Sequence, residues 1–159
     1  MLLNHTKDIY NSKINMKNLD TLARIIAKTN PEAFKAAEKL CAPMLKDIKF
    51  IPMIYLSIRE TFPEMDKTDE SILLTACVYS AYAPATLIAQ GIQRAPNGIR
   101  AAMCELMEWK DEPTVNYYQD KGRAYVKNPK FRERMALVMG EFEQFSLKSG
   151  QAGIFSSFY

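Results

Sequence analysis

Residues 71–93 read SILLTACVYSAYAPATLIAQGIQ and contain no Asp, Glu, Lys or Arg. These four residue types make up 25% of the chain, so 23 consecutive uncharged positions indicate a segment inside the folded protein. Charged residues stand on both sides of the run: Asp66, Lys67, Asp69 and Glu70 before it, and Arg94 and Arg100 after it. We therefore expect the run to form the buried centre of the molecule.

A membrane span is the alternative interpretation, since about 20 apolar residues cross a bilayer core. The length of the run fits a span, but Pro84 stands in its middle and several polar residues interrupt it. These polar residues are Thr75, Ser80, Thr86, Gln90 and Gln93. The pattern instead predicts a core helix at about 69–82, a break at Ala83–Pro84 and a short helix over 84–92, with no membrane contact.

Apolar residues at helical intervals, with Asn or Asp before several of the segments, predict helices in the rest of the chain. The predicted ranges are 19–28 with Asn18 as its cap, 31–40, 45–62, 97–109, 113–126 and 129–148. The first of them carries the apolar stripe Leu19, Leu22, Ile25 and Ile26, and the second directs Phe34, Ala37 and Leu40 inward.

These elements predict an all-α fold, a compact single-domain bundle of about six to eight helices with a C-terminal tail. We expect an N-terminal arm or short helix at 1–17, a helical domain at 18–148 and an aromatic tail at 149–159. The start of the chain lacks the basic and long apolar regions of a signal peptide, so we expect an intracellular location, cytoplasmic or within a virion assembled there.

The residue types of the chain argue against an enzyme. The single histidine, His5, has no supporting motif for a nucleophilic relay, and no phosphate-binding, dinucleotide-binding or zinc motif occurs. The acidic pairs Glu105/Glu108 and Glu141/Glu143 fit solvated surface charge better than a metal site. We expect no catalytic residues, no metal and no cofactor. The widely spaced Cys41, Cys77 and Cys104 are expected to be buried reduced thiols.

A basic segment near the C-terminus is the best candidate for binding nucleic acid. Between residues 121 and 134, Glu133 is the only acid among six basic residues: Lys121, Arg123, Lys127, Lys130, Arg132 and Arg134. Tyr117, Tyr118, Tyr125 and Phe131 are interleaved with them. Cations neutralise phosphates and aromatic faces stack on bases, so the combination suits nucleic acid, although the aromatic residues also fit a helical core.

The segment around 83–107 resembles a helix-turn-helix unit in its order of short helix, turn and helix. The resemblance implies that the helix entered through Pro96-Asn97-Gly98 would read DNA. That helix would turn Glu105 and Glu108 toward the phosphates, which is unfavourable, and any three-helix core has the same order of elements.

The C-terminal tail carries four large apolar residues in its last six positions: Ile154, Phe155, Phe158 and Tyr159. Aromatic residues are rare in disordered ends, so we expect the tail to dock on its own domain or in the groove of a neighbour. Our first hypothesis is a non-enzymatic helical subunit of a larger assembly, such as a bacteriophage connector or accessory protein. Its expected partners are other protein subunits, as a homo- or hetero-oligomer. The alternative is a nucleic-acid-binding protein that uses the basic segment.

Overall fold

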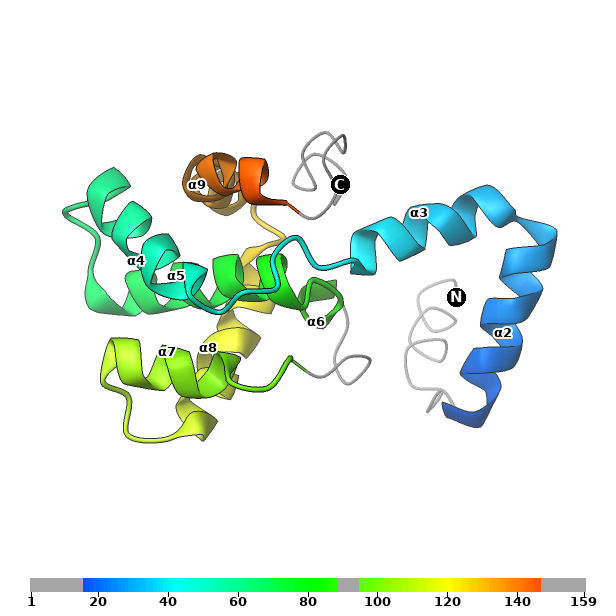
Figure 1. Cartoon of the computed structure of the whole chain (residues 1–159), viewed down its shortest axis with the longest axis horizontal. Coiled ribbons are helices and arrows are strands. Elements are labelled where there is room, and N and C mark those ends of the chain that lie inside the picture. The colour runs from blue at the N-terminus through cyan, green and yellow to red at the C-terminus, as the bar shows by residue number, and fades with distance from the viewer. Residues whose placement is uncertain (1–15, 89–94, 147–159) are drawn as a thin grey trace, which may run out of the picture. The chain divides into compact units, whose positions relative to one another are not determined.

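The computed structural model describes residues 16–88 and 95–146 of the chain (Figure 1). These residues form eight α-helices and one 3-10 helix and contain no strand, so the predicted all-α fold is confirmed. The chain divides into two compact units, residues 1–39 and 40–159. The expected limits of the helical domain at residues 18 and 148 stay predictions. Among the described helices, none combines the length and the apolar content that a bilayer crossing needs.

The first unit contains α2 (Met16–Thr29) and most of α3 (Pro31–Cys41). Helix α2 begins two residues before the predicted cap Asn18, so that cap is wrong. Asn30 is a cap as predicted, because its side chain accepts a hydrogen bond of 3.1 Å from the backbone N–H of Ala33. The predicted inward face of α3 is wrong, since no residue of α3 is buried and Ala37 is exposed. Two short helices offer too little surface to enclose a core.

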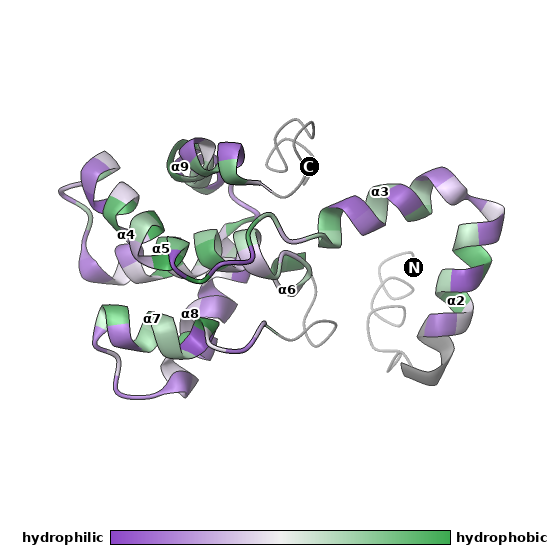
Figure 2. Cartoon of the chain, in the orientation of Figure 1, coloured by the Kyte–Doolittle hydropathy of each residue, from purple (hydrophilic) through white to green (hydrophobic). Residues whose placement is uncertain are grey.

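Helix α5 is the centre of the second unit, and it contacts four other helices there (Figure 1). The elements of this unit are α4 (Phe50–Thr61), α5 (Lys67–Tyr82), α6 (Ala85–Ile88), α7 (Ile99–Met107), α8 (Glu112–Tyr125), α9 (Pro129–Met139) and the 3-10 helix η1 (Gly140–Phe145). Helices α4, α6, α8 and α9 pack on α5, and α7 packs on α4 and α8. The hydropathy colouring in Figure 2 shows α5 as a largely apolar element among amphipathic neighbours.

Helix α5 confirms the interpretation of the uncharged run, because every residue from Glu70 to Tyr82 is buried. Asp66 caps the helix by accepting hydrogen bonds from the backbone N–H groups of Thr68 and Asp69. Buried Ser71 and Thr75 donate their hydroxyl hydrogens to backbone carbonyls one turn earlier in the same helix. The hydroxyl groups of these two residues are therefore paired although they are buried. The helix ends at the predicted break, where Ala83 precedes Pro84.

Residues 42–49 are irregular, so the predicted start of a helix at Leu45 is wrong by five residues. This strap closes the end of α5. The backbone N–H groups of Met44 and Leu45 donate to the carbonyl of Ala81 at 2.7 and 3.0 Å. The Tyr82 hydroxyl donates to the carbonyl of Asp47. The last carbonyl groups of a helix need hydrogen-bond donors from outside the helix, and the strap supplies them for α5. The apolar spacing of Ile48 and Ile51 in the sequence gave no sign of this role.

The predicted helix over 129–148 is α for only part of its length. The α-helical geometry ends at Met139, and η1 continues to Phe145. Of the apolar residues at helical intervals in this segment, Met135, Val138 and Phe142 are buried, Phe131 is partly buried and Phe145 is 45% exposed. The predicted helix over 97–109 agrees more closely with α7, which begins after Gly98, a residue with a left-handed φ of 91°. Of the predicted helix over 84–92, the part beyond Ile88 lies outside the described residues.

The three cysteines are free thiols, but the expectation that all of them are buried is wrong. Cys77 is buried in α5 and Cys104 is partly buried, and burial raises the pKa of both thiols. Cys41 is exposed at the end of α3, which lacks a buried face. Its apolar sequence surroundings gave no sign of that exposure.

Candidate functional site

The basic segment spans the end of α8, the connection 126–128 and the first half of α9. Asn128 begins α9 as predicted, with its side chain accepting a hydrogen bond of 2.9 Å from the backbone N–H of Lys130. Pro129 follows at the first helical position, where the missing N–H has no structural cost. Side chains from both helices, among them Tyr125 of α8 and Lys130 of α9, line one pocket on this surface.

Two of the six predicted binding cations, Arg123 and Arg132, form hydrogen bonds within the protein. Arg123 donates from Nε to the carbonyl of Thr86 at 2.9 Å and from a terminal nitrogen to Asp120 at 2.6 Å. Arg132 donates to the carbonyls of Val126 and Lys127 at 3.1 and 3.0 Å. These bonds tie α8 to α6 and satisfy carbonyls at the end of α8. Neither guanidinium is a free surface charge.

The other four cations, Lys121, Lys127, Lys130 and Arg134, are exposed. None of them forms an ion pair with another described residue. Lys121 lies over the ring of Tyr117 at 5.5 Å, and Arg134 lies over the ring of Phe62 at 6.0 Å. The predicted set of six therefore divides into two cations with internal hydrogen bonds and four exposed cations without an ion pair among the described residues.

A pocket of about 240 Å³ lies beside Lys130 and Arg134. Its wall includes Tyr125 and Phe131, whose ring centres are 5.5 Å apart. The remaining lining residues are Met65, Asp69, Leu73 and Asn128. We call this the α8–α9 pocket. The two aromatic residues were singled out in the sequence because they are interleaved with the basic residues. Met65, Asp69 and Leu73 come from the distant α5 region and gave no such signal.

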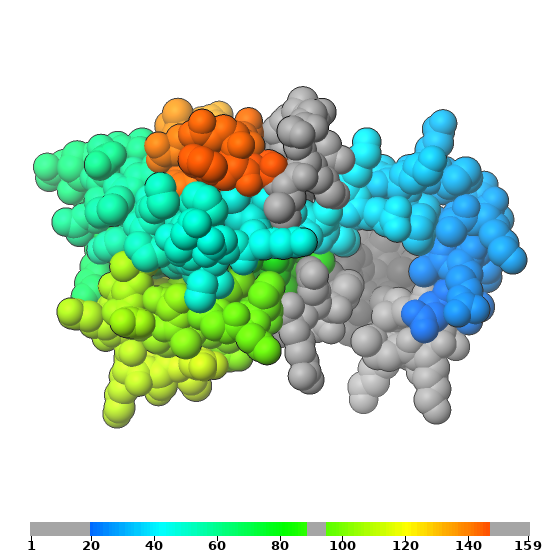
Figure 3. Space-filling view, viewed as in Figure 1, coloured from blue at the N-terminus to red at the C-terminus, as the bar shows by residue number. Residues whose placement is uncertain are grey.

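A second hollow of about 270 Å³ lies between α4 and η1. Three large apolar side chains in its lining are about half exposed: Met53 at 45%, Leu56 at 58% and Phe145 at 45%. The remaining lining residues are Ser57, Glu60, Glu141, Phe142 and Gln144. We call it the α4–η1 groove. In Figure 3 the orange η1 segment lies against the cyan strap and the start of α4, in agreement with the 5.1 Å separation of the Phe50 and Phe145 rings.

Several other residues singled out in the sequence lie in the first unit or outside the described residues. Leu22, Ile25 and Ile26 of α2 belong to the predicted apolar stripe and are each about half exposed. The tail residues Ile154, Phe155, Phe158 and Tyr159 and the single His5 lie outside the part of the chain that the structure describes. So does most of the connection between α6 and α7, so the resemblance to a helix-turn-helix unit stays untested.

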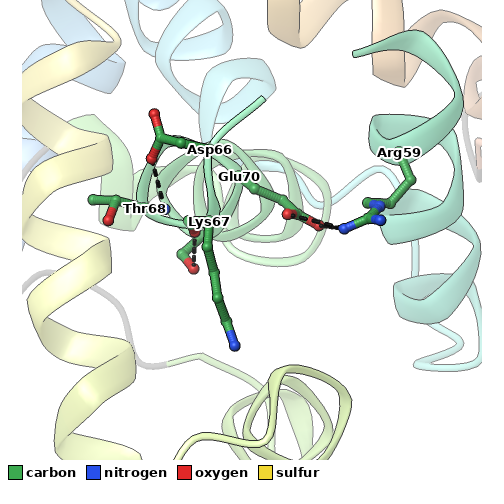
Figure 4. Close-up of polar contacts among 6 residues, drawn as sticks. Arg59, Asp66, Lys67, Thr68 and Glu70 are labelled. Carbon is green, nitrogen blue, oxygen red and sulfur yellow. Dashed lines mark hydrogen bonds and ion pairs between the residues drawn. The ribbon is translucent and has the colours of Figure 1, made fainter. Parts of the chain in front are cut away.

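The one buried charged residue among the described side chains is Glu70, in the first turns of α5. Figure 4 shows it pointing from α5 toward Arg59 of α4, with both carboxylate oxygens 3.4 Å from one guanidinium nitrogen. Burial, together with the adjacent Glu70 charge, raises the pKa of Tyr55. The Glu70 charge raises the pKa of Arg59. The arrangement joins α4 to the positive end of the α5 dipole.

We expect the Glu70→Gln substitution to lower the free energy of unfolding by about 1–3 kcal/mol, because it removes a charged hydrogen-bond acceptor from a buried position. Urea unfolding followed by circular dichroism measures the change. Arg59→Gln should cost at least as much, because it leaves the Glu70 carboxylate, whose side chain is only 4% exposed, without its charged partner. Glu64→Gln, on the exposed connection before α5, is the matched control and should leave stability unchanged. Equal losses at positions 64 and 70 would contradict the structural role of Glu70.

Among the described residues, no three His, Cys, Asp or Glu side chains come together in a way that could hold a metal ion. Glu105, Glu108, Glu141 and Glu143 are all exposed. Burial raises the pKa of Tyr79 and Tyr82, so both stay neutral core residues near pH 7. No known family model, curated protein or solved structure matches the chain.

Proposed function

We propose that this protein is a non-enzymatic helical subunit of a protein assembly, in which the tail of one copy docks in the α4–η1 groove of the next. The observation that carries the proposal is the set of three half-exposed apolar side chains in one groove, Met53, Leu56 and Phe145. Large apolar side chains gathered in a hollow are typical of contact sites rather than of free surface. Small connector proteins of bacteriophage particles are subunits of this kind.

The composition of the tail supports it as the occupant. Residues 149–159 carry no charged side chain and end in Ile154, Phe155, Phe158 and Tyr159, which match the apolar lining of the groove. Lys148 precedes the uncharged stretch, while Glu60 and Glu141 stand in the groove lining, so the charges are complementary as well. From Ser146 onward, 13 residues can span about 45 Å when extended, which is long enough to reach a neighbouring copy.

Analytical ultracentrifugation of the full chain over a range of concentrations tests the assembly. We expect the wild-type protein to associate as its concentration rises and the variant without residues 150–159 to stay monomeric with unchanged thermal stability. Leu56→Asp should also give monomers, because a carboxylate in the groove would lose its water when the tail binds. The matched control is Leu137→Asp, since Leu137 is 66% exposed and is not part of the groove lining.

A labelled peptide of residues 147–159 distinguishes docking in a neighbour from docking on the same chain. It should bind the tail-deleted variant, and Leu56→Asp in that background should abolish binding. A wild-type protein that is monomeric at every concentration while the peptide still binds the deleted variant would show docking within one chain and overturn the assembly. Association that survives both the deletion and Leu56→Asp would overturn the groove as its site.

A further inference from the structure

We propose that the α8–α9 pocket binds single-stranded nucleic acid, taking one base into the pocket and the flanking phosphates on the cations at its rim. The inference is independent of the assembly proposed above. It uses α5, α8 and α9, whereas the groove uses α4 and η1.

The wall of the pocket suits the flat face of a base. Tyr125 is 43% exposed although it stands against Phe131, with 5.5 Å between ring centres and 44° between planes. Leu73 and Met65 give the pocket apolar lining on the α5 side. A volume of about 240 Å³ is below the usual range for drug-sized ligands, so the pocket suits a single base rather than a larger ring system. Stacking on an aromatic ring is the usual way in which proteins hold an unpaired base.

The cations at the rim suit phosphate. Lys130 and Arg134 line the pocket, and Lys127 follows α8 on the connection beside it. All three are exposed and have no ion-pair partner among the described residues. Their spacing along the end of α8 and one face of α9 fits a flexible strand whose phosphates lie on both sides of the inserted base. Glu133 is exposed on α9 and is absent from the lining of the pocket.

The presence of Asp69 in the lining argues that the pocket itself does not bind phosphate. Its carboxylate lines the pocket and has no hydrogen-bond partner among the described residues. A carboxylate repels phosphate but accepts a hydrogen bond from the exocyclic amino group of a base such as cytosine. We therefore expect the base to enter toward Asp69 and the phosphates to stay near Lys130 and Arg134. A base with an amino group should bind better than thymine.

The test titrates the nuclease-treated full chain against fluorescein-labelled 12-mers of dC and dT by fluorescence anisotropy. We expect binding at 50 mM salt that weakens steeply by 200 mM, since each phosphate contact contributes about 0.7 to the log–log slope for a single strand. The dC 12-mer should bind more tightly than the dT 12-mer and than a duplex of the same length. Asp69→Asn should remove most of the difference between dC and dT.

Matched variants locate the site. Lys130→Glu together with Arg134→Glu should weaken binding at least tenfold and lower the salt slope. Lys110→Glu should not, because Lys110 lies before the other end of α8, about 20 Å away by helix length. Tyr125→Leu keeps apolar bulk but loses stacking, so we expect about a tenfold loss. Tyr117→Leu, at a tyrosine that is 55% exposed and is not part of the pocket, is its control.

Three results would overturn the proposal. The first is no binding of either 12-mer at 50 mM salt. The second is equal loss from Lys130→Glu/Arg134→Glu and Lys110→Glu, which would indicate diffuse electrostatics. The third is competition by a poly-glutamate peptide as effective as that of unlabelled dC 12-mer, which would show that the site takes an acidic protein segment. Equal affinity for dC and dT would overturn the role of Asp69.

Discussion

Leu74→Ala should lower the free energy of unfolding by about 2–5 kcal/mol, a large part of the 5–15 kcal/mol that a typical domain has. Leu74 lies in α5 and has no exposed surface. Helix α5 contacts α4, α6, α8 and α9, so the removed methyl groups leave a cavity that several helices would have to move to fill. Urea unfolding should show a midpoint lower by about 1 M or more with an unchanged slope.

Leu137→Ala is the matched control for that measurement, because it removes the same atoms from a side chain that is 66% exposed. It should change stability by less than about 0.5 kcal/mol. A small loss at Leu74, similar to the loss at Leu137, would mean that α5 is not the centre of the second unit. That result would also remove the main inference drawn from the uncharged run.

The central helix was predictable because its signals are local. A long uncharged run needs a buried environment, Asp66 supplies a cap and Pro84 supplies a stop, and all three lie between residues 66 and 93. The strap over 42–49 was not predictable, because its hydrogen bonds go to Ala81 and Tyr82, far along the chain. Apolar spacing at Ile48 and Ile51 looked helical, yet backbone conformation there depends on a distant partner.

The candidate sites show the same division between local and distant information. The sequence predicted the basic segment and its aromatic residues, but it could not separate the cations by role. Arg123 is engaged by the carbonyl of Thr86, 37 residues earlier in the chain. Asp69 of α5 lies in the same pocket as Tyr125 of α8 only because those two helices pack together. The sequence alone could not distinguish exposed apolar residues such as Leu56 from core residues, because both kinds recur at helical intervals.

The two proposals place different chemistry on different elements of the same unit. The α4–η1 groove is apolar with acidic neighbours, Glu60 and Glu141, which would repel phosphate. The α8–α9 pocket combines aromatic walls with Lys130 and Arg134, which form no ion pair with another described residue. An uncharged peptide bound there would remove water from these two charges without replacing it. Leu56→Asp should therefore leave oligonucleotide binding unchanged, and Lys130→Glu should leave association unchanged.

Gly122→Leu should lower the free energy of unfolding by about 3 kcal/mol, whereas Gly122→Ala should leave it unchanged or raise it by up to about 1 kcal/mol. Gly122 is buried where α8 crosses α5. A Cβ atom there would lie 3.4 Å from the Cβ and 3.6 Å from the Cα of Ala76, an ordinary contact distance that accepts a methyl group. The additional carbons of leucine have no such room, because the Ala76 backbone cannot move without displacing α5.

Gly140→Leu is the control, since no atom lies within 4 Å of a Cβ at that position. Urea unfolding of the three variants measures the effect, and equal tolerance of leucine at 122 and 140 would contradict the close crossing of α5 and α8.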